Sequence, residues 1–102
     1  MRTRARIDQN QPAIVETFRA HGCDVLHTHQ LGKGAPDVFV GWNGLWLACE
    51  IKTPAGRLTK AQERLYGTLR TRPRIVRSVE EADAAVGVLK AWHRAIVSRG
   101  TQ

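Results

Sequence analysis

The sequence predicts an α/β fold in which helices flank a mixed β-sheet, with the element order α-β-β-β-α-β-α. Asn43-Gly44 lies between two apolar runs and predicts a β-hairpin, because a type I′ turn needs φ > 0 at both central residues. Capping boxes at residues 59–62 and 78–81 each predict the start of a helix. The second half of the hairpin, the helix after it and the run near Arg74 form a strand-helix-strand unit, so we expect a right-handed crossover between parallel strands.

The first half of the chain supplies one helix and three strands. Asn10 can cap a helix that runs to about Ala20. Residues 25–30 alternate weakly between apolar and polar side chains, which predicts the first strand. A glycine-rich loop at 31–36 then leads into the hairpin at 37–52.

The second half supplies two helices and one strand. The capping box that starts at Thr59 opens a helix to about Leu69, and a short β-rich run follows at residues 74–79. The second capping box opens a long final helix that ends near Val97. Its helical periodicity predicts a buried apolar stripe made of Ala82, Ala85, Val86, Leu89, Trp92 and Ile96.

The length of 102 residues predicts one domain at 10–97, between a flexible basic arm at 1–9 and a frayed tail at 98–102. No apolar run approaches the roughly 20 residues of a membrane span, so we expect a cytoplasmic protein with no membrane contact. Cys23 and Cys49 should stay reduced there. The net charge of +7 favours a nucleic-acid partner, because basic surfaces attract phosphate backbones; the alternative is that the charge serves solubility alone.

The hairpin brings two acids together. With a two-residue loop at Asn43-Gly44, Asp37 lies opposite Glu50 on one face. Like charges directly opposite each other destabilise a sheet, so folding alone gives no reason for this pair, whereas a divalent cation between the carboxylates does. Lys52 leaves the same face about 7 Å further along the strand. The opposite face carries only apolar residues and should be the core side.

The three ionisable groups suit phosphoryl chemistry. Two carboxylates with a backbone carbonyl and waters match Mg²⁺ or Mn²⁺. Such an ion polarises a phosphoryl oxygen and lowers the pKa of bound water. Lys52 is placed to hold or deprotonate the attacking water, or to stabilise the pentacovalent phosphate. The alternative is a surface ion pair between Glu50 and Lys52, with Asp37 merely starting its strand.

These residues resemble the PD-(D/E)xK nuclease superfamily, through Pro36-Asp37 and Glu50-Ile51-Lys52 with twelve residues between the two motifs. The chain is most similar to small stand-alone VRR-NUC proteins of phages and prophages, in which Gly-x-Pro-Asp precedes the hairpin and Gly-Arg-Leu-Thr-x-x-Gln follows it. The matching residues here are 34–37 and 56–62, and the resemblance extends from about Asp8 to Leu89.

The resemblance implies metal-dependent phosphodiester hydrolysis on a restriction-endonuclease-like core. Asp37 and Glu50 would be metal ligands, the carbonyl of Ile51 a further ligand, and Lys52 the catalytic lysine. Gln62 has two interpretations: a side chain that caps its own helix, or the family's glutamine beside the site, which we favour. Archaeal-type Holliday-junction resolvases share this core and act as dimers, so branched DNA and a homodimer are expectations by analogy.

One position departs from the family. Relatives usually supply another acid from the first helix, where this chain has Gln11 or Ala13 at the matching position; Gln11 could still ligate weakly or through water. The departure puts a second metal ion and full catalytic strength in doubt. The residues that we expect to contact DNA are Gln11, His27, Lys33, Gly34, Arg57 and Lys60.

The leading hypothesis is a Mg²⁺- or Mn²⁺-dependent DNA endonuclease, encoded by a phage or prophage and acting in the bacterial cytoplasm on branched or other structured DNA. A non-catalytic nucleic-acid-binding module on the same fold is the first alternative. A binder of acidic proteins is the second and depends on charge alone. A zinc site at Cys23, His27 and His29 is disfavoured, since no second Cys/His pair at ligand spacing exists.

Overall fold

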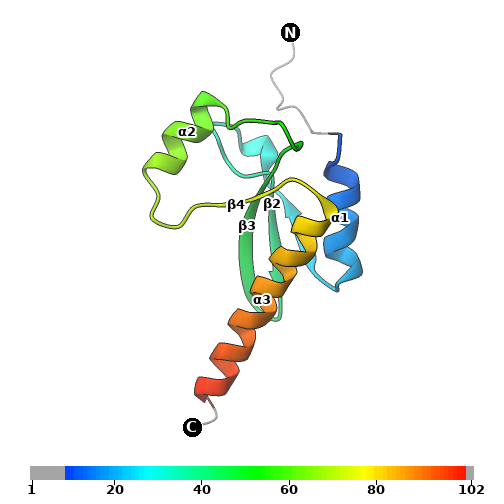
Figure 1. Cartoon of the computed structure of the whole chain (residues 1–102). Helices are drawn as coiled ribbons and strands as arrows, with labels where there is room; N and C mark the ends of the chain where they lie inside the picture. Colours follow the sequence, from blue (N-terminus) through cyan, green and yellow to red (C-terminus); the bar gives the residue numbers. More distant parts are fainter. Residues whose placement is uncertain (1–8, 101–102) are drawn as a thin grey trace.

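A computed structural model describes residues 9–100 of the chain, and these residues form one four-stranded sheet with helices on both of its faces (Figure 1). The element order confirms the α-β-β-β-α-β-α prediction, with one short 3₁₀ helix, η1, added after the first strand. The elements are α1 (Gln11–Ala20), β1 (Asp24–His27), η1 (His29–Leu31), β2 (Val38–Trp42), β3 (Leu45–Ile51), α2 (Lys60–Gly67), β4 (Arg74–Val76) and α3 (Val79–Gly100).

The hairpin forms in the predicted register. Trp42 pairs with Leu45 and Val38 with Cys49 in the antiparallel β2–β3 ladder. Asn43 and Gly44 have φ values of 50° and 84°, the positive values that a type I′ turn requires. One further step along this register sets Asp37 opposite Glu50.

The sheet has the order β1-β2-β3-β4. β1 is antiparallel to β2, while β4 runs parallel to β3, with Glu50 opposite Ile75. The chain passes from β3 to β4 through α2, so the predicted parallel strand-helix-strand unit is present.

α1 and α3 pack together against one face of the sheet, and this layer holds the core (Figure 1). The hairpin side chains predicted to face inward do so: those near the acidic end are fully buried, and those near the turn are partly buried. The completely buried core side chains include Ile14, Phe18, Val38, Val40, Cys49, Ile51, Val76 and Leu89.

Three expectations about element ends and packing were wrong. β1 ends at His27, and the chain then turns into η1 instead of continuing as a strand to residue 30. α3 continues to Gly100, where a frayed tail was expected from residue 98. Trp92 and Ile96, expected in the buried stripe, are 44% and 55% exposed, because the C-terminal part of α3 projects beyond the sheet (Figure 1).

The start of α1 is held by tertiary contacts. Asn10 occupies the N-cap position, but its side chain makes no capping hydrogen bond. Instead, Asn10 Nδ2 donates to the carbonyl of Lys52 at 3.0 Å and to the carbonyl of Arg77 at 3.1 Å. The first turn of α1 is thereby tied to the chain just after β3 and just after β4.

Most of the predicted basic arm, residues 1–8, lies outside the described residues, as do residues 101–102. Within residues 9–100, no helix combines the length and the apolar character needed to cross a membrane.

Candidate active site

Asp37, Glu50 and Lys52, together called the acid cluster here, lie at the end of the hairpin opposite its turn. All three are buried: Asp37 is 8% exposed, Glu50 2% and Lys52 9%. Asp37 Oδ2 accepts a hydrogen bond from the backbone N–H of Ile51 at 2.7 Å, so the side chain of Asp37 reaches across to β3. The predicted meeting of the two acids and the lysine is therefore observed.

Glu50 is the centre of the cluster. Its Oε2 accepts a hydrogen bond from Gln62 Nε2 at 2.7 Å and lies 3.4 Å from Lys52 Nζ. Its Oε1 accepts a longer hydrogen bond, 3.3 Å, from the Tyr66 hydroxyl. Burial, and then the neighbouring Asp37 carboxylate, raise the pKa of Glu50 to about 7, although Gln62 and Lys52 act in the opposite direction.

Gln62 performs both of the roles that the sequence suggested. Its backbone N–H donates to Thr59 Oγ1 at 3.1 Å, and its Oε1 accepts from the Thr59 N–H at 2.9 Å, which completes a capping box. Its Nε2 remains available and donates to Glu50. One side chain thus joins the start of α2 to the buried acid.

Tyr66 was not identified from the sequence. It is 3% exposed, and its hydroxyl points at Glu50 from the turn of α2 after Gln62. Burial, and then the charge of Glu50, raise the pKa of Tyr66, so its hydroxyl remains a proton donor. The spacing from Gln62 to Tyr66 is i to i+4, which sets both side chains on one helix face and could have revealed the residue.

The donor set fits a hard divalent cation with a partly hydrated shell. Within residues 9–100, no three His, Cys, Asp or Glu side chains lie close enough to hold an ion together. Mg²⁺ commonly binds through one or two carboxylates and completes its octahedron with waters and substrate phosphate oxygens. Two converging buried carboxylates match that pattern.

Gln11 places a buried polar side chain near this end of the sheet. The residue is 4% exposed, and its Oε1 is buried with no hydrogen-bond partner among the described residues. A buried acceptor without a donor is costly in a folded protein. Its neighbour Asn10 is bonded to the Lys52 carbonyl, so the start of α1 adjoins the acid cluster.

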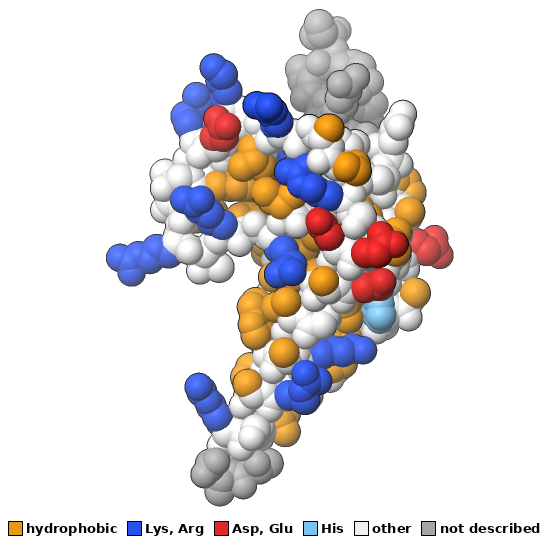
Figure 2. Space-filling view, viewed as in Figure 1, with side chains coloured by type: hydrophobic (Ala, Val, Ile, Leu, Met, Phe, Trp, Pro, Cys, Tyr) orange, Lys and Arg blue, Asp and Glu red, His pale blue; other side chains and the backbone are white. Residues whose placement is uncertain are grey.

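The other residues expected to contact DNA surround α2 and the loop before the hairpin. Lys33, Arg57 and Lys60 are exposed, and Lys33 lines a hollow together with Arg64 of α2, a residue that the sequence did not single out. Figure 2 shows lysine and arginine side chains gathered around α2, whereas acidic side chains gather near the start of α3.

Gly34, one of the residues expected to contact DNA, lies close against α2. Gly34 has φ +88°, and a Cβ atom there would lie 2.8 Å from the carbonyl oxygen of Ala61. The close approach is therefore to the backbone of α2, and it fixes the loop against the first turn of that helix.

Arg77 holds the loop that follows Lys52, another contact not foreseen from the sequence. Its guanidinium Nη1 donates to the carbonyls of Thr53 at 2.8 Å and Gly56 at 2.7 Å. A third, longer bond reaches the carbonyl of Pro54 at 3.3 Å. Because Lys52 immediately precedes this loop, Arg77 helps to fix the end of β3 at the acid cluster.

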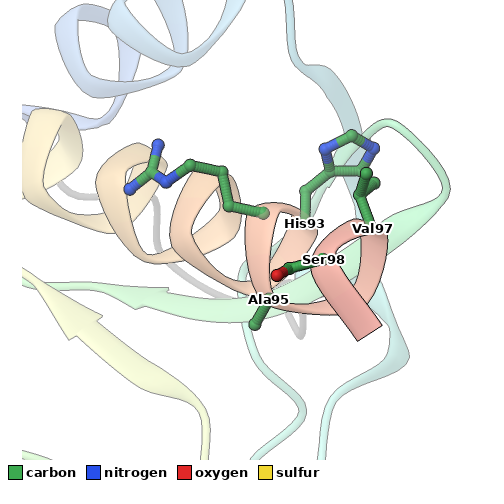
Figure 3. Close-up of a pocket in the computed structure, with 5 residues that line it drawn as sticks. His93, Ala95, Val97 and Ser98 are labelled. Carbon is green, nitrogen blue, oxygen red and sulfur yellow. The ribbon is translucent and has the colours of Figure 1, made fainter. Parts of the chain in front are cut away.

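A hollow of about 590 Å³ lies away from the acid cluster. It is lined by α3 alone, with side chains from His93 to Ser98 (Figure 3). A hollow on one projecting helix brings no groups from other elements together. The acid cluster, to which β2, β3 and α2 all contribute, is the better candidate for chemistry.

No family model, curated protein or solved structure matches this chain. The resemblance to PD-(D/E)xK nucleases therefore stays a prediction from the motifs.

Proposed function

We propose that the protein is a Mg²⁺- or Mn²⁺-dependent endonuclease that hydrolyses DNA phosphodiester bonds. The observation that carries the proposal is the buried pair Asp37 and Glu50 with Lys52 Nζ 3.4 Å from Glu50 Oε2. Two buried like charges are costly without a cation between them. The positive charge of the chain supplies the attraction to a polyanion.

The residues of the acid cluster have different roles in the proposed hydrolysis. Asp37, Glu50 and the Ile51 carbonyl would hold the cation. When bound, the ion supplies charge neutralisation at the phosphoryl group and lowers the pKa of a bound water. Lys52, held at Glu50, orients the attacking oxygen and offsets the charge that develops on the phosphate.

Gln62 and Tyr66 act on Glu50 and not on the substrate. Each donates a hydrogen bond to a different oxygen of this carboxylate, at 2.7 and 3.3 Å. These bonds fix the orientation of Glu50, which is the usual role of the groups that surround a metal ligand.

The setting that we propose is DNA of branched or other structured form, cut by a homodimer in the bacterial cytoplasm during phage or prophage activity. A chain of 102 residues has little surface with which to read a base sequence, so structure-selective or non-specific cleavage is expected. The dimer and the junction substrate follow from the family resemblance.

A non-catalytic nucleic-acid-binding module is the second candidate. The observation that favours it is Gln11, a neutral amide at the position where relatives carry an acid. This candidate predicts DNA affinity that falls with salt concentration, but no cleavage with either metal.

The test is cleavage of plasmid DNA and of a four-way junction with Mg²⁺, with Mn²⁺ and with EDTA. We expect metal-dependent cutting by the wild type and none by Asp37→Asn or Lys52→Ala. Lys90→Ala, a lysine on α3 that lies over the Trp42 ring, is the matched control and should cut like wild type. Activity in EDTA, or active cluster variants, would overturn the mechanism.

A further inference from the structure

A second hollow, about 350 Å³, lies between α1 and the end of β1, and we call it the α1–β1 pocket. It is separate from the basic hollow at α2 and from the hollow on α3. Its lining combines one face of α1 with the two histidines that flank Thr28: Gln11, Pro12, Val15, Glu16, Arg19, His27 and His29.

Hydrogen bonds place this pocket beside the acid cluster. The backbone N–H of Thr28 donates to the Asp37 carbonyl at 2.8 Å, and its hydroxyl donates to the Pro36 carbonyl at 2.6 Å. On the other wall, Gln11 follows Asn10, whose side chain is bonded to the Lys52 carbonyl. Both walls are therefore anchored to residues at or next to the acid cluster.

The walls suit a flat, heteroaromatic occupant. The rings of His27 and His29 lie edge to face, with centroids 6.2 Å apart and planes at 87°. Val15 and Pro12 add apolar surface to the lining of the same hollow. Aromatic and apolar surfaces of this kind hold unstacked nucleobases in proteins that bind single strands.

The polar groups of the pocket favour a base over a phosphate. Gln11 Oε1 and His29 Nδ1 are buried and lack hydrogen-bond partners among the described residues. The amide oxygen can only accept, so it needs an N–H donor, which nucleobases carry and phosphodiesters do not. The Glu16 carboxylate can accept from an exocyclic amino group, and its charge offsets the attraction that Arg19, which also lines the pocket, would exert on a phosphate.

We propose that the α1–β1 pocket binds one unstacked nucleobase of the DNA strand that lies at the acid cluster. This inference rests on the proposed function, and it narrows the substrate to DNA that offers an unpaired base next to the cut, as single strands, flaps and junction points do. Continuous duplex binds less well, because a paired base must first be unstacked.

The test is an abasic scan, measured as fluorescence anisotropy in EDTA so that no DNA is cut. A single-stranded oligonucleotide is compared with versions that lack one base at successive positions, and with the matching duplex. For wild-type protein we expect one abasic position to weaken binding roughly tenfold, the size of one base–aromatic stack. Abasic sites elsewhere should have little effect.

His29→Ala should remove the sensitivity to that abasic position and leave duplex affinity unchanged. His27 is exposed, so His27→Ala gives a second variant in which folding is not at risk. His21→Ala is the matched control: this histidine lies just after the far end of α1, 2.8 Å from Asp83, and should behave like wild type.

A wild-type affinity that does not depend on the position of the abasic site would contradict the proposal that the pocket binds a base. Histidine variants that weaken single-strand and duplex binding equally would contradict it too. If the protein cuts DNA with metal but no abasic position weakens binding, base binding in the pocket is rejected and the endonuclease proposal is kept. If the scan finds the position but no metal supports cleavage, the endonuclease fails and the pocket stands as a nucleic-acid-binding site.

Discussion

The face of the β2–β3 hairpin that carries the acid cluster is covered at one end and exposed at the other. At the end away from the turn, α2 covers the charged residues, so that Glu50 is 2% exposed. At the turn end, Trp46 is 47% exposed. The hydrophobic effect alone would favour the reverse, with the helix over the apolar end.

Under the proposed function, this difference marks where stability is given up for chemistry. Burying an acid beside another acid is costly, and the protein nevertheless uses Gln62 and Tyr66 to hold Glu50 there. At the turn end, the Trp46 ring simply covers Gly41, where a Cβ atom would lie 2.7 Å from the indole. Substitutions at the two ends should therefore separate activity from stability.

Lys52→Ala and Asp37→Asn should have the largest effect. Each removes a charge that acts on the reacting phosphate or its cation, so we expect single-turnover cleavage to fall by 10²–10³-fold or more, on the order of the loss for one electrostatic catalytic group. Removal of Asp37 also relieves the repulsion of Glu50, so Asp37→Asn should unfold at an equal or higher temperature. A variant that loses activity only because it is unfolded would contradict this expectation, and circular dichroism checks it.

The pH dependence of metal-free stability should be the next largest effect. The pKa of Glu50 is raised from 4.5 to about 7 on folding, so the folded state binds the additional proton between these values. Stability should therefore be greatest below about pH 4.5 and fall as the pH rises to about 7, by up to roughly 3 kcal/mol. Urea unfolding in EDTA at a series of pH values measures this change in the free energy of unfolding.

Glu50→Gln should flatten this pH dependence, because the neutral amide does not titrate in the range. Saturating Mg²⁺ should flatten it in the wild type, since an ion that stabilises the charged pair favours the folded state at neutral pH. Equal slopes for wild type and Glu50→Gln in EDTA would contradict the assignment.

Gln62→Ala should have an intermediate effect, on stability and on metal affinity together. It removes a cap and a buried hydrogen bond, which should cost about 1–2 kcal/mol. Thr59→Ala is the matched control, because it removes the capping oxygen but leaves the Gln62–Glu50 bond. We expect similar losses of stability but weaker Mn²⁺ binding only for Gln62→Ala; equal Mn²⁺ affinity in both would show that Gln62 serves only as a cap.

Trp46→Ala should have the smallest effect on cleavage. Half of the indole is already exposed, so we expect a loss of about 1 kcal/mol in the free energy of unfolding, from apolar area on Gly41. Cleavage should stay within about twofold of wild type, as for a surface site away from the chemistry. A large loss of activity in a folded variant would mean that the turn end takes part in substrate binding.

Local patterns were enough to predict the hairpin, its register and the acid cluster. Asn43-Gly44 allows one tight turn geometry, and strand alternation then determines which side chains share a face. Gln62 caps its own helix and also lies beside the acid cluster, because its Oε1 and its Nε2 bond to different groups.

Features that depend on the relative placement of elements could not be read from local patterns. Asn10 has the residue type of a cap, but the neighbouring carbonyls of Lys52 and Arg77 compete for its side chain. The stripe of α3 is continuous in sequence, yet only the part above the sheet is covered, so Ile96 is exposed. The contact of Gly34 with α2 is likewise invisible until the helix is placed.

The central claim is that Asp37 and Glu50 together form a cation site, and calorimetric titration with Mn²⁺ tests it most directly. The account predicts saturable binding to the wild type near neutral pH, and loss of that binding in both Asp37→Asn and Glu50→Gln. Lys90→Ala should bind like wild type. A wild-type protein that takes up no Mn²⁺, or acid variants that bind it equally well, would contradict the account.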